Sequence, residues 1–150
     1  MKLIAGVLIA CALSASVGAQ NGDEKAVQTA VEDFLTRLGD GQYDTLDGDF
    51  TAKALVVVTR QRDGAWTNTY EVASAWIASL KKNPTPTKFR EPISNVKITV
   101  DSNQLAYLRA DFQVVRDGKT VSSGVDQFTL MRENGRWKIV MVAYTSMPAK

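Results

Sequence analysis

The feature that most constrains this fold is a run of alternating apolar and polar residues from Ser94 to Ser146, interrupted by short turns. Two of the turns read Asp117-Gly118 and Asn134-Gly135. Such pairs are typical of two-residue hairpin loops, whose central residues need positive φ. The run therefore predicts four consecutive antiparallel strands. A sheet of this kind buries one face, so we expect the amphipathic helices upstream to cover it.

Alternation within these strands assigns an inner and an outer face, because successive side chains of a strand point to opposite sides. The apolar, inner set on the second strand of the run is Ala106, Leu108, Ala110, Phe112 and Val114. The outer set is Tyr107, Arg109, Asp111 and Gln113. On the next strand Asp126 alternates with Phe128 and Leu130, which puts one carboxyl group on the apolar side.

Length and composition describe a single folded domain and exclude several classes of function. The chain has 150 residues, of which 45% are apolar and 23% charged, as in ordinary globular proteins. Its basic residues form no cluster, so nucleic acid is not an expected partner. The chain contains no His, which removes the commonest metal ligand and the most frequent general base. We predict neither a metal nor another cofactor.

The N-terminus reads as a signal peptide over residues 1–19, followed by one domain over residues 20–150. A short apolar run, Leu3–Leu13, follows Lys2, and Val17-Gly18-Ala19 supplies small residues for a cleavage site. The run is shorter than the roughly 20 residues that span a bilayer, so no membrane span is expected. Cleavage after Ala19 would give a periplasmic or secreted protein.

A lipoprotein is the alternative reading of the same segment. Leu8-Ile9-Ala10-Cys11 resembles a lipobox, in which Cys11 would be lipidated instead of removed. Removal of residues 1–19 would take away the single cysteine, so the mature chain would hold no disulfide bond.

Helical periodicity precedes the first strands. Asp23 is a plausible N-cap and Gly39 stands where a C′ glycine would end the helix. The apolar stripe between them is Val27, Ala30, Val31, Phe34, Leu35 and Leu38. A short helix or turn over Tyr43–Phe50 follows. The acids around it are Asp40, Asp44, Asp47 and Asp49. Their spacing does not fit a calcium-binding loop, and capping and turn chemistry explain them better.

A first hairpin and a third helix complete the N-terminal half. The β-branched run Leu55–Arg60 turns at Asp63-Gly64 and returns through Trp66 towards Tyr70. Thr69 can cap the helix that follows. Its apolar stripe is Val72, Ala73, Trp76, Ile77 and Leu80. The segment Asn83–Pro86 ends this helix.

This order of elements resembles the nuclear transport factor 2-like superfamily and its SnoaL-like domains. The segments that carry the resemblance are Gly41–Leu46, Ala54–Val58 and above all Phe128–Val140. The resemblance implies an α+β, cystatin-like fold, in which a cone-shaped, curved antiparallel sheet wraps over the N-terminal helices. It also implies an apolar pocket at the open end and a homodimer paired through the sheet. It does not specify a function, because this fold hosts enzymes, binders and scaffolds.

Three kinds of enzyme in the superfamily offer patterns for comparison. Steroid isomerases use a tyrosine of the first helix, where this chain has Phe34, and SnoaL-type cyclases use a histidine. Limonene epoxide hydrolases use an Arg-x-Asp pair and a second acid, which Arg109, Asp111 and Asp126 resemble. The first two of these residues share the outer face and Asp126 the inner one, so they converge only if a β-bulge shifts the register. A polar network on the outer face is the expected role of Arg109 and Asp111.

Asp126 is the residue with the most open interpretation. An unpartnered charge on the dry face costs several kcal/mol, so Asp126 either lines a wet pocket, pairs with Arg60 or lies at the rim. In a pocket its pKa would be raised and it would be a candidate general base. We expect Trp66, Trp76 and Trp137 to pack in the core, with Trp76 and Tyr43 as alternatives for the pocket mouth. The candidate ligand-binding residues are Phe34, Tyr43, Trp76, Phe112, Asp126 and Phe128.

The leading hypothesis is an exported domain that forms a homodimer and binds a small apolar or amphipathic molecule without catalysis. The first alternative is a pocket enzyme of the isomerase, cyclase or epoxide-hydrolase type, with Asp126 as the base. The second is a protein-interaction or dimerisation module that acts through the face of the sheet.

Overall fold

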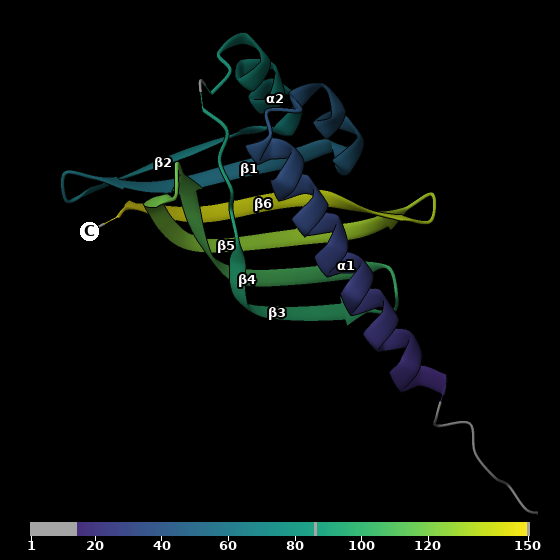
Figure 1. Ribbon diagram of the computed structural model, residues 1–150. Coiled ribbons are helices and arrows are strands. Elements are labelled where there is room, and N and C mark those ends of the chain that lie inside the picture. The colour runs from purple at the N-terminus through teal and green to yellow at the C-terminus, as the bar shows by residue number, and fades with distance from the viewer. Residues whose placement is uncertain (1–14, 86, 150) are drawn as a thin grey trace, which may run out of the picture.

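The computed structural model describes residues 15–85 and 87–149, which form one sheet and three helical segments. The elements are α1 (Ala15–Gly39), η1 (Tyr43–Asp49), β1 (Phe50–Arg62), β2 (Ala65–Val72), α2 (Ala73–Lys82), β3 (Ile93–Asp101), β4 (Leu105–Arg116), β5 (Lys119–Glu133) and β6 (Arg136–Pro148). The strand order is β2-β1-β6-β5-β4-β3, and α1 crosses one face of the curved sheet (Figure 1). The predicted α+β class and helix-covered sheet are confirmed.

The four-stranded meander has the predicted turns. Strands β3 to β6 pair antiparallel in sequence order, and β1 joins this sheet by pairing parallel to β6. At the first turn φ is 49° for Asp117 and 73° for Gly118, and at the second it is 52° for Asn134 and 76° for Gly135. Positive φ at both central residues is the signature of the predicted hairpin loops.

The inner face of the sheet forms the core together with α1. Leu108, Phe128 and Leu130 are completely buried, as are Val27 and Val31 of α1. The outer face is open, with Tyr107 40% exposed. The predicted inside and outside of the sheet are therefore correct.

Both predicted ends of the first helix are wrong in detail. Asp23 is not an N-cap, because α1 begins at Ala15 and Asp23 instead forms an ion pair with Arg132 of β5. Gly39 is the last helical residue, and the glycine with positive φ is Gly41, at 74°. Gly39 has a different structural requirement: a Cβ atom there would lie 2.3 Å from the backbone oxygen of Phe89. It permits a close approach of two segments.

The second hairpin strand is longer than predicted and more exposed. Strand β2 continues to Val72 and Thr69 pairs with Val58, so Thr69 does not cap α2. Every residue of β2 is exposed, and Trp66 is 48% exposed instead of packing in the core. The reason is that β2 is an edge strand, paired only with β1. Trp137 is half-buried, with the guanidinium of Arg132 4.7 Å from its ring centre.

The aspartates around η1 form ion pairs that tie this turn to its neighbours. Asp49 meets Arg37 of α1 at 2.6 Å, and Lys81 of α2 lies 3.0 Å from Asp47 and 3.4 Å from Asp44. Asp40 meets Arg90 at 2.7 Å. Within residues 15–85 and 87–149, no three acidic, His or Cys side chains gather as a metal site would require.

The predicted signal segment falls largely outside the described residues, which begin at Ala15. Cys11 lies outside them, and the predicted cleavage site after Ala19 lies within α1. Cleavage and the boundary at residue 20 stay predictions. None of the helices in the described part of the chain is long and apolar enough to cross a membrane.

Candidate functional site

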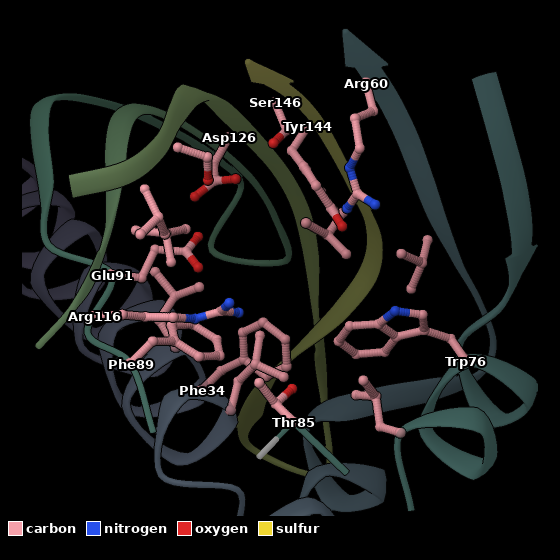
Figure 2. A pocket seen from close by; sticks show the side chains of 18 of the residues that line it. Phe34, Arg60, Trp76, Thr85, Phe89, Glu91, Arg116, Asp126, Tyr144 and Ser146 are labelled. Carbon is pink, nitrogen blue, oxygen red and sulfur yellow. The ribbon is translucent and has the colours of Figure 1, made fainter. Parts of the chain in front are cut away.

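A cavity of about 520 Å³ lies between the inner face of the sheet and the helical segments. Its aromatic lining is Phe34, Tyr43, Trp76, Phe89, Phe128 and Tyr144. Its charged lining is Arg60, Arg62, Glu91, Arg116 and Asp126. Figure 2 shows several of these side chains directed into one space from different walls. The cavity thus combines an apolar wall with ionisable groups, of which Asp126 is buried.

The apolar wall is built by edge-to-face and tilted aromatic contacts centred on Phe34 of α1. Its ring centre lies 5.3 Å from that of Phe50, 6.1 Å from Phe128 and 6.5 Å from Trp76. Phe34 and Phe128 are almost fully buried, whereas Trp76 is half-buried. Aromatic pairs at these separations are favourable. They give the cavity an apolar surface on which a flat molecule can pack.

The segment between α2 and β3 carries Glu91 into the cavity. The backbone N–H of Phe89 donates to the oxygen of Gly39 at 3.0 Å, and Arg90 and Val115 exchange two backbone hydrogen bonds of 2.9 and 2.8 Å. The chain is extended here, so side chains alternate. Phe89 and Glu91 both line the cavity, and Arg90 between them is exposed. The close approach at Gly39 therefore helps to place Glu91.

Asp126 occupies the middle of β5, where it pairs with Ala110 of β4 and Tyr144 of β6. It is 2% exposed, and no donor in the described residues meets its Oδ2 atom. Figure 2 shows the carboxyl groups of Glu91 and Asp126 facing each other. Of the predicted alternatives, Asp126 lines the cavity and does not lie at the rim.

The two acids hold a proton near neutral pH. Burial raises the pKa of Glu91 to about 7, opposed by a hydrogen bond from Asp126. Burial raises the pKa of Asp126 to about 8, helped by the negative charge of Glu91 and by their mutual hydrogen bond. If both facing carboxyl groups were ionised, their negative charges would repel each other. The pair therefore shares a proton. A protonated Asp126 then donates to the Glu91 carboxylate.

Arg60 contacts Tyr144 and does not pair with Asp126. Burial raises the pKa of Tyr144, and the positive charge of Arg60 and its hydrogen bond to the phenol oppose that rise. Pairing with Arg60 was one of the three alternatives for Asp126, and this alternative is therefore wrong. Arg60 is long and flexible, and a neighbouring strand offers it a different partner.

Five of the six predicted ligand-binding residues line the cavity, and Phe112 does not. Phe112 is 4% exposed and packs edge-to-face on Tyr144, with ring centres 6.3 Å apart. Phe112 therefore lies behind the residues that line the cavity. The alternation of apolar and polar residues correctly assigned its face of the sheet, but it does not show where along that face the cavity lies. Ligand binding by Phe34, Tyr43, Trp76, Asp126 and Phe128 stays a prediction.

The predicted polar network on the outer face is present. Arg109 meets Asp111 at 2.6 Å, and the Asn95 amide donates to Asp111 at 2.7 Å. The hydrogen bond from Asn95 and the charge and hydrogen bond of Arg109 lower the pKa of Asp111. Because Asp126 lies on the opposite face, these three residues do not form the hydrolase triad.

Sequence reasoning missed Glu91, Arg116 and Tyr144. Glu91 lies in a segment without helical or strand periodicity. Phe89 and Glu91 are two residues apart, with Arg90 between them, and this spacing indicates that both side chains point to the same side of an extended chain. Tyr144 shares inner-face parity with Val142 on β6. Arg116 is the last residue of β4, where the alternation with apolar residues has already ended.

This arrangement can do two things chemically. A flat molecule can pack against the aromatic wall while its polar edge meets the acid pair, Tyr144 or an arginine. The acid pair can also take up or give a proton near neutral pH, which is what acid–base catalysis requires.

Comparisons with known proteins support the fold. The family described as "Putative lumazine-binding" matches residues 22–145. No curated protein matches the chain. Among solved structures, a protein of unknown function from Mycobacterium tuberculosis is 17% identical, with TM-score 0.72, over 89% of this chain and 77% of that one.

Two structures from Novosphingobium aromaticivorans agree with this likeness. One, called a putative scytalone dehydratase, is 14% identical with TM-score 0.70 over 87% of both chains. The other, an NTF2-like protein with a cystatin-like fold, is 15% identical with TM-score 0.66 over 91% of this chain and 88% of that one. Together these matches confirm the predicted nuclear transport factor 2-like, cystatin-like fold.

Proposed function

The chain belongs to the putative lumazine-binding family, and we propose that it binds a small ring compound in the cavity between its helices and sheet. The observation that carries this proposal is the meeting of an aromatic wall with a proton-sharing acid pair, buried Asp126 and half-buried Glu91, in a space of about 520 Å³. A buried polar atom without a partner costs free energy. The hydrogen bond between Asp126 and Glu91 occupies one oxygen of each carboxyl group, and a ligand can supply partners for the remaining oxygens.

The expected ligand is flat and amphipathic, as a lumazine is. Its ring would pack against Phe34 and Trp76, and its ring N–H would donate to the acid pair of Glu91 and Asp126. The Tyr144 hydroxyl can donate to a ring carbonyl. A flat ring with polar atoms at its edge fits the description of the family as lumazine-binding. Small-molecule sites in general also combine an apolar lining with a few polar groups.

Thermal unfolding with and without lumazine tests the proposal. A ligand at 100 times its Kd stabilises the folded state by about 2.7 kcal/mol, so the melting temperature rises. The Trp76→Ala variant should lose most of this rise, because it removes part of the aromatic wall. Trp66→Ala is the matched control: Trp66 is exposed on β2 and should leave the rise unchanged. If neither lumazine nor any other flat ring compound stabilises the protein, the proposed function is wrong.

A second candidate function is proton-transfer catalysis on the bound compound, in an isomerase, cyclase or hydrolase. The observation in its favour is the pKa of Asp126, raised to about 8, where a base or acid works near neutral pH. Asp126→Asn should then abolish turnover of the bound compound while binding persists. Recovery of the ligand unchanged after prolonged incubation, by mass spectrometry, would favour binding alone.

We also propose that the protein is exported and dimeric. The N-terminal sequence supports export to the periplasm or beyond, with a mature chain that begins at Gln20. Exposed apolar side chains of the outer face, Leu105, Tyr107 and Met131, support pairing through the sheet. N-terminal sequencing of the fractionated protein and light scattering test these two points. A monomer that captures no partner would also count against an interaction module.

A further inference from the structure

The arginines that line the cavity lack acidic ion-pair partners, whereas four of the arginines elsewhere in the described chain have one. Arg37, Arg90, Arg109 and Arg132 each pair with an aspartate. Arg60, Arg62 and Arg116 line the cavity, and none of them has an acidic partner within residues 15–85 and 87–149. An arginine stays charged at every physiological pH. The cavity therefore contains positive charge that its own wall does not pair.

The acids of the cavity do not supply the missing partners. Glu91 and Asp126 interact with each other, and no arginine is among the groups that shift the pKa of either acid. A guanidinium beside either acid would lower its pKa, whereas both are raised. Because the pair keeps a proton near neutral pH, its charge is smaller than the positive charge of the arginines that line the same space.

Two of these arginines enter the cavity from different walls. Arg116 extends from the end of β4 across the ring of Phe89, with 5.7 Å from its guanidinium carbon to the ring centre. Its Nε–H is buried, and no acceptor meets it in the part of the chain that the structure describes. Arg60 extends from β1 to Tyr144. Figure 2 shows both guanidinium groups directed towards the middle of the cavity. A desolvated donor without an acceptor is costly, so Arg116 calls for a ligand that accepts hydrogen bonds, and the charge of Arg60 without an acidic partner favours the same kind of ligand.

We propose that the ring compound carries an anionic oxygen group, a carboxylate or a phosphate, and that Arg60 and Arg116 bind this group. This inference rests on the proposed function, since it names the class of ligand for the same cavity. The planar fork of a guanidinium matches carboxylate and phosphate oxygens and forms strong charge-assisted hydrogen bonds with them. The Glu91–Asp126 pair tolerates a nearby anion because it retains its proton. It meets a neutral polar group of the ligand.

Calorimetric titration with three flat probes tests this inference. The probes are 2-naphthoate, its neutral amide 2-naphthamide, and 2-naphthyl phosphate. We expect the wild-type protein to bind at least one anionic probe about tenfold or more tightly than the amide, since a charge-assisted hydrogen bond is worth about that factor. This preference should shrink as salt is raised, because salt screens the attraction. Tighter binding of the phosphate than of the naphthoate would assign a phosphate ligand, and the reverse a carboxylate.

Three variants connect the preference to its residues. Arg116→Gln and Arg60→Gln should each reduce the preference for the anionic probe by about tenfold while binding of the amide persists. Arg136→Gln is the matched control. Arg136 is exposed beside the turn at Asn134-Gly135 and does not line this cavity, so its loss should change nothing. Far-ultraviolet circular dichroism of each variant checks that it is folded.

The outcomes separate this inference from the proposed function. If the amide binds as tightly as the anionic probes, or if both cavity variants keep the preference, the inference is wrong and the ligand site stands. If none of the three probes binds, and lumazine also fails, both are wrong.

Discussion

Two aspartates on neighbouring strands of one sheet behave in opposite ways. Asp111 of β4 lies on the outer face, where Asn95 and Arg109 hold its pKa below the ordinary value. Asp126 of β5 lies on the inner face, where burial and Glu91 raise its pKa to about 8. The side chains are identical, so the difference comes only from the face of the sheet to which each one points. Asp111 on the outer face forms an ion pair that stabilises the sheet, whereas Asp126 on the inner face can exchange a proton near neutral pH.

The contrast extends to the whole of each face. On the outer face Arg109 and Asp111 compensate each other's charge in contact with solvent, so their interaction is individually weak. The inner face holds Phe128 and Leu130 beside an acid pair and unpaired arginines. Among the described residues Arg109 has an acidic partner on the outer face whereas Arg60 and Arg116 have none inside, so the cavity suits an anionic ligand.

The largest effect should come from the inner apolar wall. Phe128→Ala removes a fully buried ring that packs on Phe34, and we expect it to lower the free energy of unfolding by about 3–5 kcal/mol. Tyr107→Ala on the outer face should change it by about 0.5 kcal/mol or less. Urea unfolding of both variants measures the difference. Equal losses would mean that the two faces are not distinct.

The second effect is an unusual dependence of stability on pH. The carboxyl groups of Glu91 and Asp126 hold their protons in the folded state but lose them in the unfolded chain once pH exceeds their ordinary values of 4.5 and 3.8. Stability should therefore be highest in mild acid and fall as pH rises towards 7 and 8, by up to about 1.4 kcal/mol per pH unit for each proton. Asp126→Asn should reduce this fall. If the free energy of unfolding changes with pH in the same way in the wild-type protein and in Asp126→Asn, the two acids do not share a proton.

A third variant tests how Glu91 reaches Asp126. In Gly39→Ala the new Cβ would lie 2.3 Å from the backbone oxygen of Phe89, so the segment that carries Glu91 must shift. We expect a loss of about 1–3 kcal/mol in the free energy of unfolding, together with a lower pKa of Asp126. Gly48→Ala is the matched control, because the space around Gly48 is open. An unchanged Asp126 titration in folded Gly39→Ala would show that Glu91 does not depend on this contact.

The smallest effect belongs to the outer acid. The pKa of Asp111 is lowered in the folded state. Ionised Asp111 therefore stabilises the folded state at pH values above the ordinary carboxyl pKa, and this contribution disappears as pH falls through the lowered pKa. Asp111→Asn should cause a slight loss of thermal stability at pH 7 that vanishes in strong acid and in high salt. A loss that grows as pH falls would reverse the assignment of the two aspartates.

The faces of the sheet could be predicted from the sequence because alternation and turn residues are local signals. Asp117-Gly118 and Asn134-Gly135 set the hairpins, and Phe128 identified the side on which Asp126 lies. The depth of a side chain is not local. Phe112 lies behind the cavity lining, packed on Tyr144, and Trp66 lies on an exposed edge strand. Both positions depend on the strand order and register of the whole sheet.

The sequence also does not predict which groups the long side chains of Arg60 and Glu91 contact. Arg60 could reach several groups, and its choice of Tyr144 over Asp126 follows from the three-dimensional register of β1 and β6. Glu91 belongs to a segment whose position depends on backbone hydrogen bonds to α1 and β4. No periodic pattern records such contacts, so the acid pair becomes visible only in the folded chain.

The most direct test of the shared proton is a carbon-detected NMR titration of the aspartate and glutamate carboxyl groups in the intact protein. Asp126 should titrate near 8 and Glu91 near 7, each sensing the other, while Asp111 titrates below its ordinary value. An Asp126 carboxyl that ionises near pH 4, independently of Glu91, would contradict the account.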